Sequence, residues 1–384
     1  MKSHQQFNTD LTRRSWLLLA TSALTGCGGG SGGGGGASTA SAPGTGGTGI
    51  YQGSISGFGS VIINGVTYDN SQAVMRLNDV VVSQDQLRLG MVATVRGDRT
   101  AGTASTVDVW SVAQGVVSEL SAGQFKVAGM NILTSTTTWL YGTTALTTGD
   151  YVSVWGLQAD VNGHSWTATC VVASSASTDA VSSGLVSIED GQFKLNGLSL
   201  SGAVSSLTDG MLVRVQGTWG SASRLSVVSS KLIDSAVVAQ SQGHVEIVSD
   251  VEIEGVVTTA PSGTGFMLGS ITVAALPASY SPPGAKITVG SRVEVHGAWV
   301  GGVLKATQVE LEDELNIGIT EIKSVLQQFT SLADFVMQGQ RCNATGVVLS
   351  PTMITALSRK GAVFKVKGVK SGNWLNVSEM ELDH

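Results

Sequence analysis

The 384-residue sequence has few of the residues from which catalytic and metal sites are built. It contains 5 histidines, 3 cysteines and 6 prolines, and charged residues make up only 13% of the chain. Globular proteins carry about 25% charged residues, so this composition excludes a highly charged disordered chain and a coiled coil. The net charge of −6 argues against a nucleic-acid partner, because phosphate contacts require clustered Lys and Arg side chains.

Glycine is the abundant residue, with 50 copies, and hydrophobic residues make up 42% of the chain. The glycines have no three-residue period, which excludes collagen. The hydrophobic content is sufficient to bury several small cores or one or two large ones. The glycines fall into two settings, an uninterrupted run near the N-terminus and regularly spaced positions further along.

The N-terminal segment resembles a bacterial export signal. After the basic residue Lys2 and two arginines, Trp16 to Leu24 form an apolar run that is too short to cross about 30 Å of hydrocarbon comfortably. Leu24-Thr25-Gly26-Cys27 then resembles the lipoprotein box, in which the cysteine is lipidated and becomes the mature N-terminus. We therefore expect residues 1–26 to be a cleaved signal and Cys27 to carry the lipid. An uncleaved anchor helix is the alternative.

The export route and the destination rest on neighbouring residues. Arg13 and Arg14, in TRRSWL, resemble the twin-arginine signal, and a general secretion signal is the alternative. Gly28 follows Cys27 where an aspartate would retain a Gram-negative lipoprotein at the inner membrane. The resemblance therefore implies a lipid anchor in the outer membrane, facing the periplasm or the cell surface.

A glycine-rich segment follows the cysteine. Twelve of the 22 residues from 28 to 49 are glycine, and none is charged or large. Such a segment buries nothing that would offset the entropy lost on ordering, so residues 27–49 are expected to be a flexible tether. A phosphate-binding loop is the alternative, but the segment lacks the GxxxxGK[ST] pattern.

Beyond residue 50 the chain repeats. An eight-residue motif begins and ends with glycine and alternates apolar with mostly polar residues between them, as in GMLVRVQG; it occurs at 90–97, 149–156, 210–217, 290–297 and 361–368. Alternation with period two predicts a half-buried β-strand, and the flanking glycines suit turns with unusual backbone angles. A strand–glycine–strand hairpin such as FKLNG precedes each motif, and another strand follows it.

Each repeat thus holds about five short strands in about 60–75 residues. We assign the repeats to residues 50–111, 112–176, 177–236, 237–313 and 314–384. Because closure removes exposed strand edges, we predict an all-β chain of tandem small antiparallel barrels of the OB type. An extended β-sandwich or pairwise-fused barrels are the alternative. Ile322, Val325, Leu326 and Phe329 have helical spacing, but the repeat pattern places a strand there.

These features resemble a known family. The segment GSISGFGSVIINGVTYD at 53–69 and the recurring GxxVxVxG strands are similar to bacterial envelope lipoproteins with tandem copies of a domain of unknown function. The resemblance covers residues 50–384. It is good in the first three repeats and looser in the fourth, which carries the insertion PASYSPPG at 277–284, and in the fifth. It implies an OB-like fold and an envelope location, and it supplies no catalytic residues.

No group of residues predicts catalysis or metal binding. The histidines are scattered, and His296 is expected to be a solvated surface residue. Cys170 alternates with apolar neighbours and is expected to be buried, with a disulfide to Cys342 as the alternative. The acidic run from Glu310 to Glu314 lacks an EF-hand pattern and is expected to be a solvated linker. We therefore expect no enzyme activity, no metal and no cofactor.

Three tryptophans are candidate ligand contacts. Trp155 occupies an outward strand position that is polar in the other four repeats, and Trp219 and Trp299 both lie two residues past a closing glycine. Because OB-type barrels bind extended ligands through exposed aromatic residues, these side chains are candidates for contacts to sugars or proteins. The alternative is that they cap barrel ends or fill seams between repeats.

Two kinds of function remain open from the sequence. One is a lipid-tethered module with a structural or protein-interaction role in the cell envelope. The other is a surface protein that binds a glycan or another polymer through exposed tryptophans. The expected partners are the membrane, through the N-terminal lipid, and an envelope protein or polysaccharide.

Overall fold

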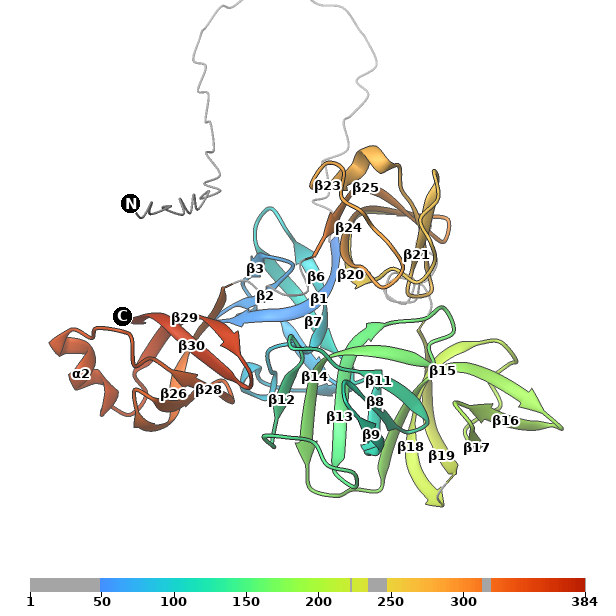
Figure 1. The fold of residues 1–384 in the computed structure, drawn as a ribbon, viewed down its shortest axis with the longest axis horizontal. Helices are drawn as coiled ribbons and strands as arrows, with labels where there is room; N and C mark the ends of the chain where they lie inside the picture. Colours follow the sequence, from blue (N-terminus) through green and yellow to red (C-terminus); the bar gives the residue numbers. More distant parts are fainter. Residues whose placement is uncertain (1–48, 222, 234–246, 313–318, 384) are drawn as a thin grey trace, which may run out of the picture. The chain divides into compact units, whose positions relative to one another are not determined.

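The structure, a computed structural model, describes residues 49–221, 223–233, 247–312 and 319–383. In these ranges the chain is almost entirely β-strand, with one short α-helix, α2 (Pro351–Leu357), and the 3₁₀ turns η1 (Gln84–Gln86) and η2 (Pro277–Ser279). Figure 1 shows the strands as five successive groups along the sequence colours from blue to red. The expected export signal and all of the expected tether except Gly49 lie outside the described residues.

We call the five groups of strands barrels 1 to 5. Barrel 1 contains β1 (Gly49–Phe58), β2 (Val61–Ile63), β3 (Val66–Tyr68), β4 (Val74–Leu77), β5 (Val80–Val81), β6 (Val92–Asp98) and β7 (Thr103–Val109). Barrel 2 contains β8 (Ala113–Val116), β9 (Ser118–Ser121), β10 (Gln124–Val127), β11 (Met130–Leu133), β12 (Trp139–Tyr141), β13 (Tyr151–Gln158) and β14 (Ser165–Ser174). Barrel 3 contains β15 (Asp179–Glu189), β16 (Gln192–Leu195), β17 (Leu198–Gly202), β18 (Leu212–Ser221) and β19 (Arg224–Leu232).

The last two barrels follow the same order. Barrel 4 contains β20 (Ile247–Val256), β21 (Gly265–Leu268), β22 (Ile271–Ala274), β23 (Tyr280–Ser281), β24 (Arg292–Val300) and β25 (Val303–Leu311). Barrel 5 contains β26 (Thr320–Ser331), β27 (Asp334–Met337), β28 (Gln340–Asn343), β29 (Val363–Ser371) and β30 (Trp374–Leu382). The residues with helical spacing therefore lie in a strand, β26, as the repeat pattern predicted.

Barrel 3 shows the pairing that closes each group. The strand β15 pairs with β16 and with β18, β16 pairs with β17, and β18 pairs with β19, all antiparallel. The ring is closed by β17 and β19, which run parallel. Barrels 2 and 5 have the same five pairings, and in barrels 1 and 4 a single bridge replaces one of them. This strand order, 1-2-3-5-4-1, is that of an OB-type barrel, so the predicted fold is confirmed, except that the closing pair is parallel.

The two glycines of the repeated motif have different structural roles. The opening glycine has a positive φ in all five barrels, as at Gly149 (φ +99°) and Gly210 (φ +78°), a region that favours glycine. The closing glycine instead sits at a β-bulge where the next strand approaches closely. A Cβ on Gly217 would lie 1.9 Å from the carbonyl oxygen of Ser226. The expectation of unusual backbone angles thus holds for the opening glycine, whereas the closing glycine is needed for space.

Strand β1 is shared between barrels. Besides pairing with β2 and β6 of its own barrel, it runs parallel to β20 of barrel 4, with Ile50 opposite Val251. Its other end runs parallel to β26 of barrel 5, with Gly57 opposite Glu321. Barrels 2 and 3 meet where Val181 of β15 pairs with Gln114 of β8. The barrels are therefore joined by main-chain pairing and by packed side chains.

Candidate binding sites

Two of the three candidate tryptophans are buried. Trp155 is 3% exposed and Trp299 is 4% exposed, so neither fits the ligand-contact hypothesis, and the alternative of a packing role fits both. Trp155 lies beside the bulge at Gly156 and packs in the hydrophobic cluster that includes residues of barrels 1 and 5, such as Leu89 and Phe335. The outer face of its strand is covered by neighbouring barrels. The polar residues at equivalent positions of the other repeats had indicated a solvent-exposed face instead. Trp299 belongs to the core of barrel 4.

Trp219 remains accessible. It is half-buried between the cores of barrels 2 and 3 and lines an open hollow of about 650 Å³ together with Asn196, Lys126 and Glu119. The buried indole Nε1 has no hydrogen-bond partner among the described residues, and neither does the Oδ1 of Asn196. The Nδ2 of Asn196 donates to the carbonyl of Ser183 at 2.8 Å, which holds the amide in place. The hollow thus combines a half-buried indole with the Lys126–Glu119 ion pair, while the indole N–H and the amide oxygen are both buried.

The two described cysteines are free and buried. Cys170 is 0% exposed, as predicted, and Cys342 has the same exposure. Burial raises the pKa of the Cys342 thiol to about 12 and also raises the pKa of the Cys170 thiol. The thiolate is the reactive form of cysteine, and a raised pKa keeps both thiols protonated. Both side chains therefore have a packing role. His296 is half-buried rather than fully solvated, and its Nε2 lies 3.1 Å from Oδ1 of Asp250.

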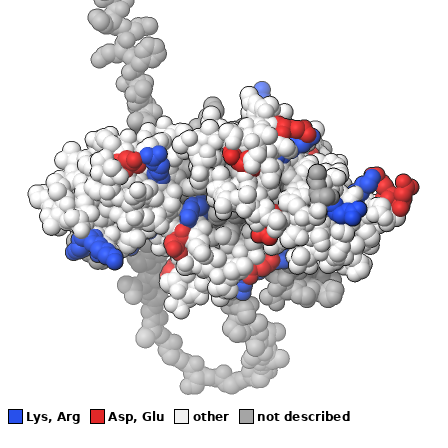
Figure 2. All heavy atoms as spheres, turned by 90° about the horizontal axis from the view of Figure 1, so that it is seen from below, with Lys and Arg blue, Asp and Glu red and all other residues white. Residues whose placement is uncertain are grey.

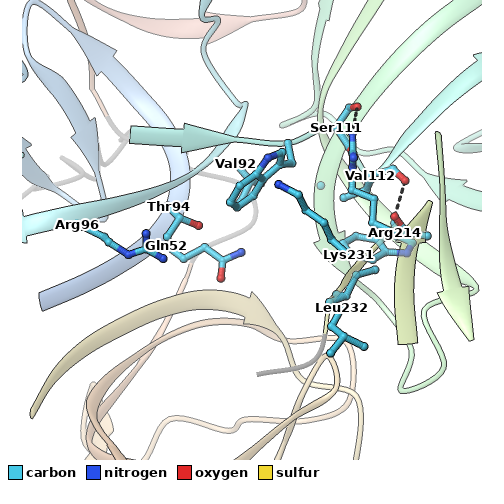
Figure 3. A pocket seen from close by; sticks show the side chains of 14 residues that line it. Gln52, Val92, Thr94, Arg96, Ser111, Val112, Arg214, Lys231 and Leu232 are labelled. Carbon is cyan, nitrogen blue, oxygen red and sulfur yellow. Dashed lines mark hydrogen bonds between the residues drawn. The ribbon is translucent and has the colours of Figure 1, made fainter. Parts of the chain in front are cut away.

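A second pocket lies where residues of barrels 1, 2 and 3 meet. It has a volume of about 110 Å³ and three cations in its lining, Arg96, Arg214 and Lys231, with no carboxylate among its lining residues. Figure 3 shows Arg96, Thr94 and Gln52 along one side and Arg214 on the other, with the Lys231 side chain extending between them in this view.

Arg214 is fixed by neutral oxygens. Its Nε donates to the carbonyl of Ser111 at 2.6 Å, and its Nη2 donates to Oδ1 of Asn78 at 2.9 Å and to Oγ of Ser111 at 3.4 Å. Asn78 has a positive φ of 50° and also accepts from the backbone N–H of Ser111, so one amide joins barrel 1 to barrel 3. Arg214 is only 6% exposed, and burial lowers its pKa to about 10, with Asp79 opposing the shift.

The sequence did not single out this pocket. Arg96 and Arg214 sit at positions of the repeated motif that alternate with apolar residues, which predicted solvent exposure for both. Arg214 is instead covered because β18 lies against the loop that ends barrel 1. The one feature of the sequence that could have drawn attention to these arginines is the scarcity of charge. In a chain with 13% charged residues, each cation is more notable than usual.

Charged residues elsewhere form no large patch of one sign on the face seen in Figure 2, where small blue and red groups lie on a mostly white surface. In the described ranges, no three His, Cys, Asp or Glu side chains are grouped to hold a metal ion. No helix in the same ranges is long and apolar enough to cross a membrane. Cys27, Arg13 and Arg14 lie outside the described residues.

Comparison with known proteins gives a domain and a weak structural likeness. The model of a domain of unknown function, DUF5666, matches residues 114–171 and 254–310, which lie in barrels 2 and 4. The fourth repeat is therefore matched despite its proline-bearing insertion. A solved structure of Drosophila Unr CSD456 is 15% identical, with a TM-score of 0.14, over 53% of this chain and 98% of that one. No curated protein matches.

Proposed function

We propose that this chain is a lipid-anchored bacterial envelope protein whose five OB-type barrels form a non-catalytic interaction module. Support for the anchor is the lipoprotein box ending at Cys27 and the glycine-rich segment after it. The observation that carries the proposal is the position of β1, which begins at Gly49, where that segment ends, and pairs with strands of barrels 1, 4 and 5. A lipid on Cys27 would thus hold the whole body through the strand that joins these barrels.

Contacts between barrels favour a module that acts as one body. Ser183 of barrel 3 donates its hydroxyl to the carbonyl of Val112 at 2.7 Å, and Lys370 of barrel 5 donates to the carbonyl of Thr136 in barrel 2 at 2.7 Å. Joined barrels present fixed spacing between their surfaces, which suits simultaneous contact with a large partner. A series of independently moving domains would lack these bonds.

Metabolic labelling with palmitate tests the anchor. The full-length protein is expected to incorporate label and to fractionate with the outer membrane, and Cys27→Ala is expected to abolish labelling. Cys342→Ala is the matched control, because this buried thiol lies in barrel 5 and should leave labelling unchanged. Label that survives in Cys27→Ala would overturn the anchor.

Two further sets of variants test the destination membrane and the export route. Gly28→Asp is expected to shift the labelled protein toward the inner membrane. Arg13→Lys with Arg14→Lys is expected to block export through the twin-arginine route and to have little effect on general secretion. Unchanged fractionation of Gly28→Asp would contradict the outer-membrane assignment while leaving the anchor itself intact.

Glycan binding is the second candidate, and the hollow at Trp219 favours it. A sugar ring could stack on the half-buried indole, and its hydroxyls could bond to Lys126 and Glu119, which also line the hollow. The probes are chitohexaose and soluble peptidoglycan fragments, titrated while tryptophan fluorescence is recorded. Trp219→Ala is expected to weaken binding by about tenfold or more, because it removes an apolar contact worth about 1.5 kcal/mol or more.

The control for this hollow is Trp374→Ala in barrel 5, where another half-buried indole is stacked with Arg341 at 4.1 Å from its ring centre. Binding that is lost equally in both variants, or that is absent in the wild-type protein, would rule out a glycan site at Trp219. The anchor would be unaffected by that result.

A further inference from the structure

Arg214 is a buried cation without a buried anion. Its described hydrogen-bond partners are the backbone carbonyl and hydroxyl of Ser111 and the amide oxygen of Asn78, all neutral. Buried charges are normally paired, because removal from water costs several kcal/mol per ion. Asp79, the carboxylate whose charge acts on Arg214, is exposed and already forms an ion pair with Lys231. The protein therefore holds Arg214 in a place where an additional anion would be stabilised.

One guanidinium nitrogen is free to receive that anion. The Nη1 of Arg214 has no accepting partner among the described residues. Arg96 lines the same pocket, although its Nε is fully buried. Arg96 lies 3.8 Å from Asp108, which is closer to Arg76 at 3.2 Å. The pocket thus has cationic side chains on both of its sides.

The rest of the pocket is mainly apolar. Val92, Val112, Trp166 and Ile233 line it. Its buried hydroxyls are those of Thr94, Ser111 and Ser183, and the two serine hydroxyls already donate to Asn78 and to the carbonyl of Val112. The volume of about 110 Å³ is comparable to the roughly 150 Å³ cavity that accommodates a benzene ring. The walls therefore fit a small hydrocarbon group, and they would leave a fully hydrated inorganic ion without partners for its remaining oxygens.

We propose that the pocket between Arg214 and Arg96 is a binding site for a small organic carboxylate whose apolar or aromatic body contacts Val92 and Val112. A carboxylate presents two acceptors in one plane, which matches the donors of a guanidinium. A phosphate carries additional charged oxygens that would face the apolar walls. The site is independent of the lipid anchor and of the hollow at Trp219.

Isothermal titration of the chain without its expected signal and lipidated cysteine, residues 28–384, with benzoate tests the site. We expect a dissociation constant of about 1 mM, ordinary for a ligand with so few atoms. Benzyl alcohol, which keeps the ring without the charge, and inorganic phosphate, which keeps a charge without the ring, are each expected to bind at least about tenfold more weakly. Equal binding of benzyl alcohol, preferential binding of phosphate, or no heat with benzoate would each overturn the proposal.

Variants locate the site. Arg96→Met is expected to weaken benzoate binding about tenfold with the fold intact, because Asp108 keeps its closer partner Arg76. Arg214→Met is expected to abolish binding, although it also removes the bonds to Asn78 and Ser111. Arg224→Met is the control, since Arg224 is an exposed residue of barrel 3 outside the pocket lining. Unchanged affinity in Arg96→Met, or a loss as large in Arg224→Met, would place benzoate elsewhere and overturn the assignment.

Discussion

Arg99 of barrel 1 forms an ion pair with Glu252 of barrel 4, whose carboxylate is only 1% exposed. Glu252 lies opposite Tyr51 in the parallel pairing of β1 with β20, so the ion pair covers a junction made of main-chain bonds. Two residues along β20, Glu254 pairs with Arg292 and accepts from the backbone N–H of Ser54 at 2.6 Å. The contact between the first and fourth barrels is therefore built around two buried carboxylates.

Removing one partner of this pair should destabilise the junction more than removing both. Arg99→Met leaves a buried carboxylate without its cation and is expected to cost about 2–4 kcal/mol in the free energy of unfolding. Glu252→Gln added to Arg99→Met removes that charge and is expected to recover at least about 1 kcal/mol. Urea unfolding at pH 7 measures these two variants and Glu252→Gln alone, which completes the cycle. Strictly additive losses would show that the two side chains are not coupled.

Closing glycines should tolerate no side chain. Gly217→Ala puts a Cβ at 1.9 Å from a backbone carbonyl, so β18 and β19 must separate, at an expected cost of about 2–4 kcal/mol. Gly220→Ala in the same strand is the control, because its nearest contact would be at 3.8 Å. Thermal unfolding of the two variants should differ by several degrees, and equal transition temperatures would contradict the close-approach explanation.

Stability should fall in alkaline solution. Burial raises the pKa of Cys170 and Cys342, and burial together with the hydrogen bond to Asp250 raises the pKa of Tyr51. In the unfolded chain these thiols and this phenol titrate near 9 and 10, so the unfolded state loses protons first. The free energy of unfolding is therefore highest below pH 9, where these groups are protonated in both states. Above pH 9 it decreases by up to about 1.4 kcal/mol per pH unit for each thiol.

The cysteines can be tested separately from the tyrosines. In the double variant Cys170→Ala and Cys342→Ala, the decrease between pH 9 and 10 should be much shallower, because the remaining groups titrate higher. Urea unfolding at pH 8, 9 and 10 gives the slopes, with each protein compared with its own value at pH 8. The same slope in wild type and variant would refute the contribution of the thiols.

Buried and accessible tryptophans should differ in their contribution to stability. Trp155→Ala and Trp299→Ala open cavities in packed clusters and are expected to cost about 3–5 kcal/mol each. Trp219→Ala removes a half-buried ring from the hollow between barrels 2 and 3, and a cost of only about 1–2 kcal/mol is expected. Urea unfolding monitored by circular dichroism measures all three, and a loss for Trp219→Ala as large as for the others would show that it is a core residue.

The sequence predicted the strands because their pattern is local. Alternation over six residues between two glycines is set by the pleat and by nearby turns, so GMLVRVQG in barrel 3 could be assigned without knowledge of any neighbour. Cys170 could be placed inside for the same reason. The parallel pair that closes each barrel, such as β17 with β19, has no comparable local signal, because it joins strands separated by another strand.

The surroundings of each outward face could not be predicted in this way. Trp155 and Arg214 both lie on strands that the period-two pattern predicted correctly. Both side chains are nevertheless buried by residues from another barrel. A period-two pattern separates the two faces of a strand but does not say whether the outer face meets water or protein. The contacts of Arg214 with Asn78 and Ser111 join positions more than a hundred residues apart, and a single sequence carries no record of them.

The shared pairing of β1 has a consequence for the order of events during synthesis. Strand β1 is made first, yet its pairing is completed only when barrels 4 and 5 supply β20 and β26. Until then its unpaired N–H and C=O groups form an open strand edge, the feature through which chains aggregate or exchange segments. The strand pairing of β1 therefore stays incomplete until the C-terminal half of the chain has been made. Truncation after barrel 3 would leave these backbone groups of β1 permanently unpaired.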